Sequence, residues 1–342
     1  MKFGVGLPTC TAGMMYPVPF ASKDDIVRVA IESEQLGYYE VAGNDHFTTQ
    51  QYVRETFADP PDFFDPLITY AYCAAKTSVL RLMTGIIVVP MRHPIVLAKQ
   101  LATLDQFSDG RVIVGAGIGA YREELEACFP DLAGAKRADL MRESLEALRV
   151  LLEERNANYD GEYIRFHDVE MFPKPVQKRL PIYSAGNSDG AIKRAAQIGD
   201  GWLPAGIAAD RIGAAKEKLA RYAQEAGRDP STIKIAPQLI VCVGENAEEA
   251  RRRFEGSQLY EHLVSLQQST LKNVAIDEYM STNLVGTPEQ VCKQVAELEA
   301  VGVDHLCGLY FVGNTVDEML DQVRLFGREV LPNFPDRVEA VA

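Results

Sequence analysis

The chain has 342 residues, of which 47% are hydrophobic, so it can bury either one large core or two ordinary ones. Its formal net charge of −13 and pI near 5.0 argue against nucleic-acid binding, because gripping phosphate backbones requires a basic stripe. The longest apolar stretch, residues 82–91, is interrupted by Thr84 and Gly85 and is too short to span a bilayer, so a membrane protein is not expected.

The N-terminus and the cysteines predict a cytoplasmic protein. Met1 leads directly into an apolar segment without the basic region, apolar helix and cleavage site of a signal peptide. The cysteines form no C-x-x-C pair, and several lie in apolar segments. They are Cys10, Cys73, Cys128, Cys242, Cys292 and Cys307. This pattern is typical of reduced core residues, and we expect neither disulfides nor a metal centre.

In chain order, strand-like segments alternate with amphipathic helical patterns. The predicted strands are residues 3–7, 39–43, 82–89, 112–115, 181–185, 201–204, 233–243 and 305–310. The predicted helices include residues 23–36, 189–198, 209–226 and 288–301. No linker rich in proline, glycine and serine marks a domain boundary. Residues 1–342 therefore predict a single domain of the α/β class, a closed (β/α)8 TIM barrel with insertions.

Two segments do not fit the repeat. Residues 156–166 are rich in turn formers with alternating aromatics, which predicts a small hairpin. Residues 255–283 carry Tyr260, His262, Tyr279 and Met280 on a weakly helical pattern. Long excursions on the upper face of a barrel commonly form lids over the site, and the alternative is an outer helix or a dimer surface.

The unit spanning residues 92–119 links two predicted strands through a helix and ends in Gly115-Ala-Gly117-Ile-Gly119. Backbone without Cβ atoms then lies at the carboxyl end of a strand, where α/β folds place flat cofactors. Gly115 and Gly117 are therefore candidate cofactor contacts. Read as a dinucleotide fingerprint, the glycines require an acidic residue at the end of the next strand. That region, residues 136–152, predicts an amphipathic helix instead, which argues against a nicotinamide site.

Ordered sequence blocks across the chain resemble the luciferase-like family of flavin- and deazaflavin-dependent oxidoreductases. The blocks are Phe3-Gly-Val-Gly-Leu-Pro8, Asn44-Asp-His-Phe47, Arg92-His-Pro94, Leu104-Asp-Gln-Phe-Ser-Asp-Gly-Arg111, Pro173-Lys-Pro-Val-Gln177, Pro181-Ile-Tyr-Ser-Ala-Gly-Asn-Ser188, Gly199-Asp-Gly-Trp202, Val285-Gly-Thr-Pro-Glu-Gln-Val291 and Gly302-Val-Asp-His-Leu306. The resemblance implies a barrel whose carboxyl-end loops hold an isoalloxazine or deazaflavin ring.

The resemblance also implies where the ring sits. In this family a non-prolyl cis peptide forms a bulge at the end of the third strand and supports the back of the ring, and Gly85-Ile86 is the matching position. The alternative is that Gly85 only relieves close packing. By resemblance His46 lies near the reactive face as an acid/base or a hydrogen-bond donor, a role that suits an imidazole at neutral pH. Asp45 is expected to orient it. Alternatively, His46 is simply bonded within its loop.

The cofactor phosphate is expected at Gly186-Asn187-Ser188, where a predicted helix starts after the fifth strand. Free backbone amides at a helix start suit an anion, although ordinary capping by Asn187 or Ser188 is the alternative. Arg92 and Lys174 are candidate cations for this group. Glu123 and Glu124, just past the glycine-rich turn, either face the site or form a plain charged helix start.

The resemblance implies hydride transfer between coenzyme F420 and a small organic substrate. The alternatives are an FMN-dependent monooxygenase, which uses the reactivity of reduced flavin with oxygen, and a non-catalytic flavin-binding subunit. Thr48-Thr-Gln-Gln51 stands where family members that oxidise sugar phosphates carry an aromatic, which disfavours a sugar-phosphate substrate. Neither H-E-x-x-H nor G-x-S-x-G occurs, so metal and serine-hydrolase chemistry are unsupported. The family usually pairs its barrels, and we expect a homodimer.

Overall fold

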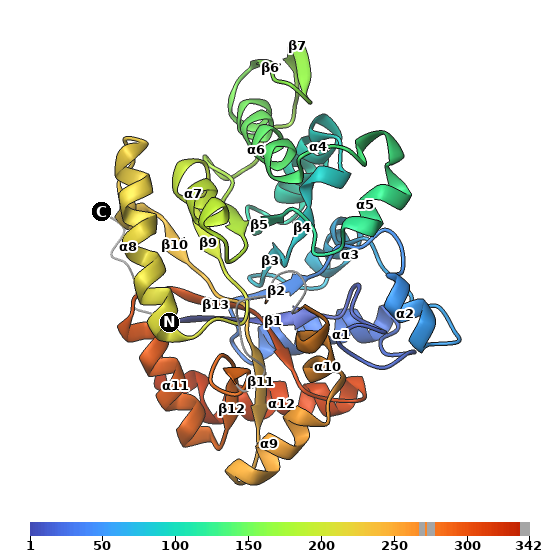
Figure 1. Ribbon diagram of the computed structural model, residues 1–342, viewed down its shortest axis with the longest axis vertical. Coiled ribbons are helices and arrows are strands. Elements are labelled where there is room, and N and C mark those ends of the chain that lie inside the picture. Colours follow the sequence, from blue (N-terminus) through green and yellow to red (C-terminus); the bar gives the residue numbers. More distant parts are fainter. Residues whose placement is uncertain (267–270, 272–277, 336–342) are drawn as a thin grey trace.

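Parallel strands surrounded by helices make up the molecule (Figure 1). The structure, a computed structural model, describes residues 1–266, 271 and 278–335. The strands are β1 (Lys2–Leu7), β2 (Glu40–Gly43), β3 (Arg81–Thr84), β4 (Ile87–Val88), β5 (Val112–Gly117), β6 (Asn156–Asp160), β7 (Arg165–Glu170), β8 (Ile182–Ala185), β9 (Gly201–Leu203), β10 (Lys234–Ile235), β11 (Ile240–Val243), β12 (Leu284–Gly286) and β13 (His305–Phe311).

The main sheet closes into a barrel, as the sequence predicts. Among the described residues its order is β10-β9-β8-β5-β3-β2-β1-β13-β11-β12, with β4 beside β5. The two ends meet because β10 and β11 belong to one continuous segment. β10 pairs with β9, while the carbonyls of Ile235 and Pro237 accept hydrogen bonds from Asp304 N and Cys307 N at 3.0 and 3.1 Å. The ring of parallel strands is therefore complete.

Helices follow the strands and cover the outside of the barrel. They are α1 (Lys23–Gln35), α2 (Gln51–Thr56), α3 (Pro66–Ala74), α4 (Pro94–Phe107), α5 (Arg122–Cys128), α6 (Arg137–Glu153), α7 (Asp189–Gln197), α8 (Ala209–Glu225), α9 (Ala247–Glu255), α10 (Gln258–Ser265), α11 (Pro288–Ala300) and α12 (Val316–Glu329). Their starts follow from local chemistry. Ser22 and Thr287, for example, form capping boxes with the side chains three residues on.

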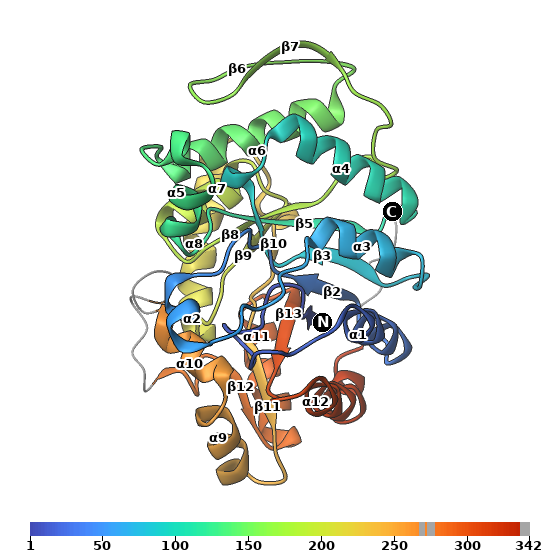
Figure 2. The same cartoon turned by 90° about the vertical axis from the view of Figure 1, so that its right-hand side faces the viewer.

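Two strand predictions differ in detail from the structure, and one strand was missed. Residues 82–89 form two strands, because the chain bulges at Gly85 and Ile86. Residues 233–243 are likewise split, and Pro237 lies in the gap, where it has no N–H to donate to a ladder. β12 was not predicted from the sequence and pairs with β11. The predicted hairpin is confirmed as the antiparallel pair β6 and β7, which projects from one end of the molecule (Figure 2).

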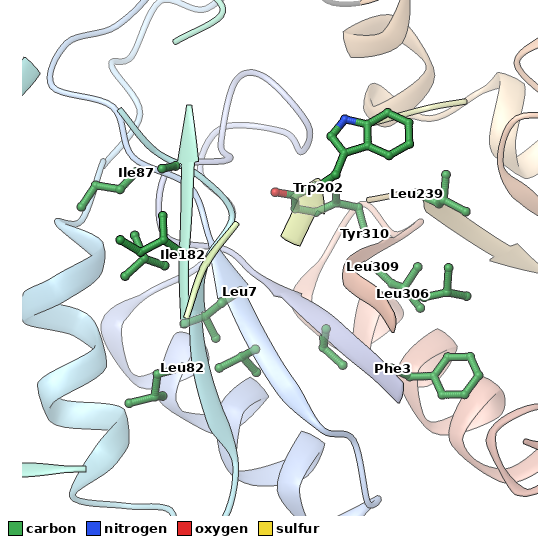
Figure 3. Close-up of a cluster of buried hydrophobic side chains, with 14 of the residues drawn as sticks. Phe3, Leu7, Leu82, Ile87, Ile182, Trp202, Leu239, Leu306, Leu309 and Tyr310 are labelled. Carbon is green, nitrogen blue, oxygen red and sulfur yellow. The ribbon is translucent and has the colours of Figure 1, made fainter. Parts of the chain in front are cut away.

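Two apolar layers hold the barrel. Side chains such as Phe3, Leu306 and Leu309 pack between the strands and the helices, and the ring of Phe3 lies 5.5 Å from that of Phe326 in α12 (Figure 3). The interior contains a separate cluster from strands around the ring: Ala42, Met83, Ile113, Tyr183, Leu203, Ala236 and Cys307. Because both layers are filled, the rim at the strand ends is where a ligand can enter. Within the described part of the chain, no helix has the length and apolar character needed to cross a membrane.

Candidate active site

The predicted site residues come together at one rim of the barrel. Asp45 and His46 follow β2, Gly85 and Ile86 follow β3, and Gly117 ends β5. The segment 186–188 follows β8. In a parallel barrel these carboxyl ends share one face, which is the face that carries active sites.

The Gly85–Ile86 peptide is cis, as the sequence predicts, and it lies at the end of β3. Gly85 N donates to Gly43 O at 2.8 Å, while Gly85 O faces the side chains of Gln238 and Tyr310, each at 3.5 Å. A Cβ on Gly85 would lie 2.9 Å from that of Ala42, so close packing also requires glycine here. The half-buried side chain of Ile86 forms an apolar platform at the rim.

Gly115 and Gly117 support this bulge from β5. A Cβ on Gly115 would lie 2.1 Å from the carbonyl oxygen of Thr84, and one on Gly117 would lie 2.7 Å from the side chain of Ile86. Thr84 Oγ1 also donates to Gly115 O at 2.7 Å. The two glycines therefore allow β5 to approach the end of β3, so chain packing alone accounts for them.

His46 is held by Glu124, which the sequence offered as a residue that either faces the site or starts a helix, but did not identify as the partner of His46. Glu124 lies in the first turn of α5, is only 2% exposed, and its Oε2 is 2.9 Å from His46 Nδ1. Its Oε1 accepts from the amides of Phe47 and Thr48 at 2.5 and 3.3 Å. The amide nitrogen of Gln50 also lies 3.0 Å from Nδ1. Nε2 of His46 makes no hydrogen bond with the described residues, so it is the nitrogen available to a ligand.

Glu124 is ionised at neutral pH. Burial by itself would raise the pKa of this carboxyl, but the hydrogen bond and charge of His46 and the amides of Phe47 and Thr48 lower the pKa below its ordinary value. An anionic carboxylate accepts the Nδ1 proton of the imidazole. Glu124 thereby fixes the tautomer of His46.

Asp45 and Arg92 form an ion pair that neutralises both charges. Asp45 is buried and accepts from Val88 N at 2.9 Å and from Arg92 Nε and Nη2 at 3.1 and 2.6 Å. Arg92 Nη2 also bonds Asp65 at 2.9 Å. Asp45 therefore makes no hydrogen bond to His46, and Glu124 has the orienting role expected of Asp45. Arg92, with two carboxylates, fixes the loop after β2 against the segment after β3.

The loop 186–188 is capped internally but keeps free amides. Asn187 bridges to Ala205 through both ends of its side chain, at 2.8 and 3.0 Å, and Ser188 caps the Ala191 amide at 3.2 Å. Gly186, with φ +120°, accepts from Trp202 Nε1 at 2.8 Å. The side chains of Asn187 and Ser188 therefore act as caps, which is the alternative that the sequence left open.

The backbone at the start of α7 remains suited to an anion. The first-turn amides of residues 189 and 190 find no acceptor in the described residues, and a Cβ on Gly190 would meet only Ser188 Oγ, at 3.9 Å. An open, amide-lined helix start of this kind fits a phosphate. Lys174 is not part of it, because its Nζ bonds Leu151 O at 2.7 Å near the end of α6.

Helix α10, from the 255–283 segment, packs against the rim. Its Ser265 lies near the hydroxyls of Tyr52 and Tyr121, which are 3.2 Å apart. Buried His262 is close enough to His46 for the two imidazoles to interact electrostatically. Figure 2 shows α10 beside α2. This placement agrees with the lid interpretation for residues 258–265, whereas residues 267–270 and 272–277 lie outside the described residues. In the sequence, His262 and the aromatic residues of this segment were the signal that could have pointed to its place at the site.

Comparison with known proteins gives the following matches. The family model described as luciferase-like monooxygenase matches residues 1–305. An FMNH2-dependent dimethylsulfone monooxygenase of Pseudomonas fluorescens (strain Pf0-1) is 26% identical over 356 residues, covering 97% of this chain and 94% of that protein. An F420-dependent glucose-6-phosphate dehydrogenase of Kineococcus radiotolerans is 31% identical over 179 residues, covering 51% of this chain and 50% of that protein. The crystal structure of the monooxygenase RslO1 from Streptomyces bottropensis has a TM-score of 0.81 at 24% identity, covering 98% of this chain and 100% of that one.

Proposed function

Since this chain belongs to the luciferase-like monooxygenase family, we propose that it is an oxidoreductase that transfers a hydride between coenzyme F420 and a small organic substrate. The observation that carries the proposal is the His46–Glu124 pair at the barrel rim. Removing a hydride from a carbon that bears a hydroxyl requires a base for the hydroxyl proton. His46, with Nδ1 held by an ionised carboxylate and Nε2 unpartnered in the described residues, is built for that task.

The residues present fit a flavin-type cofactor. Ile86 offers an apolar platform at the bulge, and the first-turn amides of α7 offer a phosphate site. When bound, the deazaflavin supplies a two-electron hydride acceptor or donor. His46 Nε2 accepts the hydroxyl proton of the substrate, and the carboxylate of Glu124 stabilises the resulting imidazolium. In the reverse direction His46 returns the proton to the carbonyl oxygen.

A second candidate is an FMNH2-dependent monooxygenase. The relative that covers 97% of this chain is named for that activity, whereas the F420-dependent relative matches about half of it. The same rim residues serve either cofactor, because the two rings share their flat shape. They differ at the ring position that makes reduced flavin, but not deazaflavin, reactive with oxygen.

A binding titration separates these candidates. Purified protein is titrated with oxidised F420, FMN, NAD and NADP, followed by fluorescence or absorbance. We expect micromolar or tighter binding of F420 and weaker binding of FMN, with no comparable nicotinamide binding. Preference for FMN together with oxygen consumption by the reduced complex would support the second candidate. Tight nicotinamide binding without flavin binding would refute both.

We also propose that the protein is a homodimer. Large apolar side chains are exposed on and next to the neighbouring helices α3 and α4: Ile68, Tyr72, Val79, Val96 and Phe107. Large exposed apolar side chains gathered on neighbouring helices commonly mark a protein interface. Light scattering after size-exclusion chromatography should give twice the mass of one chain for the wild type. For Phe107→Glu it should give the mass of a single chain. A wild-type monomer at micromolar concentration would rule out this proposal.

A further inference from the structure

Several buried polar side-chain atoms lack a hydrogen-bond partner in the described part of the chain, and three of them belong to residues near His46. They are Thr11 Oγ1, Gln50 Oε1 and His262 Nδ1. All three residues are buried. Buried polar groups in folded proteins are almost always paired, and each exception calls for a partner. A ligand bound at the barrel rim is such a partner.

These residues reach the rim from three separate segments. The side-chain amide of Gln50, after β2, lies 3.0 Å from His46 Nδ1. Thr11, after β1, follows Cys10, whose Sγ donates to Phe64 O at 3.2 Å, next to the Phe63 ring that lies 5.6 Å from the ring of His46. His262 comes from α10 and interacts electrostatically with His46. Convergence from loops far apart in the sequence is typical of a binding pocket on a barrel.

The charges around His46 disfavour an anionic ligand. Arg92 is held by Asp45 and Asp65, and Arg54 bonds Thr48 Oγ1 and Thr49 O at 2.8 and 2.9 Å. Burial lowers the pKa of His262 to about 3, so this imidazole is neutral at physiological pH. The nearest described carboxylate to His46, Glu124, is ionised. A phosphate or carboxylate on the substrate would face that charge, and neither Arg92 nor Arg54 among the described residues is free to pair with it.

The remaining surroundings are aromatic. The ring of His46 lies 5.6 Å from that of Phe63 and 6.1 Å from that of Tyr121. Tyr121 in turn lies beside Tyr52, with ring centroids 5.8 Å apart. Such walls favour a ligand whose body is apolar and whose polar group is small.

We propose that Thr11, Gln50 and His262 line the substrate pocket and that the substrate is an uncharged apolar molecule bearing one hydroxyl or carbonyl oxygen, with His262 as the lid residue that contacts it. This inference rests on the proposed function and names the substrate class for the same site. His262 then acts as a specificity residue. A ligand that can hydrogen-bond its Nδ1 gives this buried nitrogen a partner, whereas a ligand that cannot leaves it unpaired.

Saturation-transfer NMR tests the proposal on wild type and three variants, each with and without the flavin-type cofactor that binds. The neutral probes are cyclohexanol and cyclohexanone, and the charged probes are cyclohexanecarboxylate and glucose 6-phosphate. We expect both neutral probes to bind wild type at least tenfold more tightly than either charged probe. His262→Leu should weaken neutral-probe binding about tenfold, the typical effect of one lost hydrogen bond. His262→Asn, whose amide nitrogen replaces Nδ1, should stay within about threefold of wild type.

Exposed Glu261, the preceding residue of α10, provides the matched control, and Glu261→Ala should change neither neutral nor charged binding. Cofactor affinity should be equal in all variants, which also reports that they fold. Equal or tighter binding of the charged probes, no binding of either neutral probe, or an unchanged His262→Leu variant would overturn the inference. Failure of any flavin-type cofactor to bind wild type would instead overturn the proposed function, since probe binding is also measured without it.

Discussion

Replacing Glu124 by glutamine is the sharpest test of the site. The carboxylate accepts three hydrogen bonds, from His46 Nδ1 and from the amides of Phe47 and Thr48. Glutamine keeps one acceptor oxygen, which the two amides can retain. Its NH2 group then faces His46, so Nδ1 must accept and the ring proton must move to Nε2. The nitrogen proposed to act as the base would then carry a proton of its own.

The structure sets the size of the effect. Glu124→Gln loses one charge-assisted hydrogen bond, so the free energy of unfolding should fall by ~1.5–3 kcal/mol. Glu124→Ala should cost more, because the partly buried Phe47 and Thr48 amides also lose their acceptor, at about 0.5–1.5 kcal/mol for each hydrogen bond. For either variant kcat should fall about 10²-fold or more, the usual contribution of general acid–base catalysis.

Two measurements check this prediction. Nitrogen-15 NMR of the imidazole reports which ring nitrogen of His46 carries the proton, without any substrate, and urea denaturation gives the stability. The matched control is Glu123→Gln, because exposed Glu123 accepts only the Gln51 amide, at 2.9 Å, and glutamine can replace it. A Glu124→Gln protein whose His46 still carries its proton on Nδ1, with unchanged stability, would refute the orienting role.

Three further predictions follow from the same contacts. His46→Ala should lower kcat about 10²-fold or more with little change in cofactor affinity, and full activity of this variant would return His46 to a structural role. His46→Gln should keep activity only if catalysis needs a hydrogen bond from this position and no proton transfer. Arg92→Met should lower the free energy of unfolding by about 3–5 kcal/mol, because it leaves Asp45 buried without its counter-ion, whereas weaker cofactor binding at unchanged stability would point to a ligand role instead. Burial lowers the pKa of His262 from 6.5 to about 3, so between these values the unfolded chain binds a proton that the folded chain does not. The free energy of unfolding should therefore fall as pH drops from 6.5 toward 3, by up to about 1.4 kcal/mol per pH unit. His262→Asn should flatten this part of the plot of urea-derived stability against pH, and an unchanged slope would contradict a buried neutral imidazole.

The barrel was predictable from the sequence because its strands are buried on both faces. β5, for example, is a short run of valine, isoleucine, alanine and glycine, and such runs between amphipathic helices are typical of parallel sheets. The break at Gly85 could be placed through the family resemblance, whereas the break at Pro237 could not, since it depends on neighbouring strands. β12 has only three residues, too few for a periodic pattern to stand out.

The grouping of the candidate site residues at the barrel rim was predictable, but their pairings were not. Asp45 and His46 are adjacent in the chain, which suggested that one orients the other, yet the partner of His46 is Glu124, 78 residues away. A glutamate in the first turn of a helix looks the same whether it faces solvent or a histidine. Arg92 likewise read as a free cation, because a sequence shows charges without the carboxylates that neutralise them.

The closure of the barrel has a consequence for how the chain is made. Lys2 pairs with His305 and Phe3 with Leu306, so the first strand finds one of its neighbours only after some three hundred further residues have left the ribosome. Such distant pairing makes folding slow and leaves β1 with an open edge during synthesis. Chains whose synthesis is incomplete should therefore depend on chaperones. This dependence should end when β13, the last strand to emerge, pairs with β1.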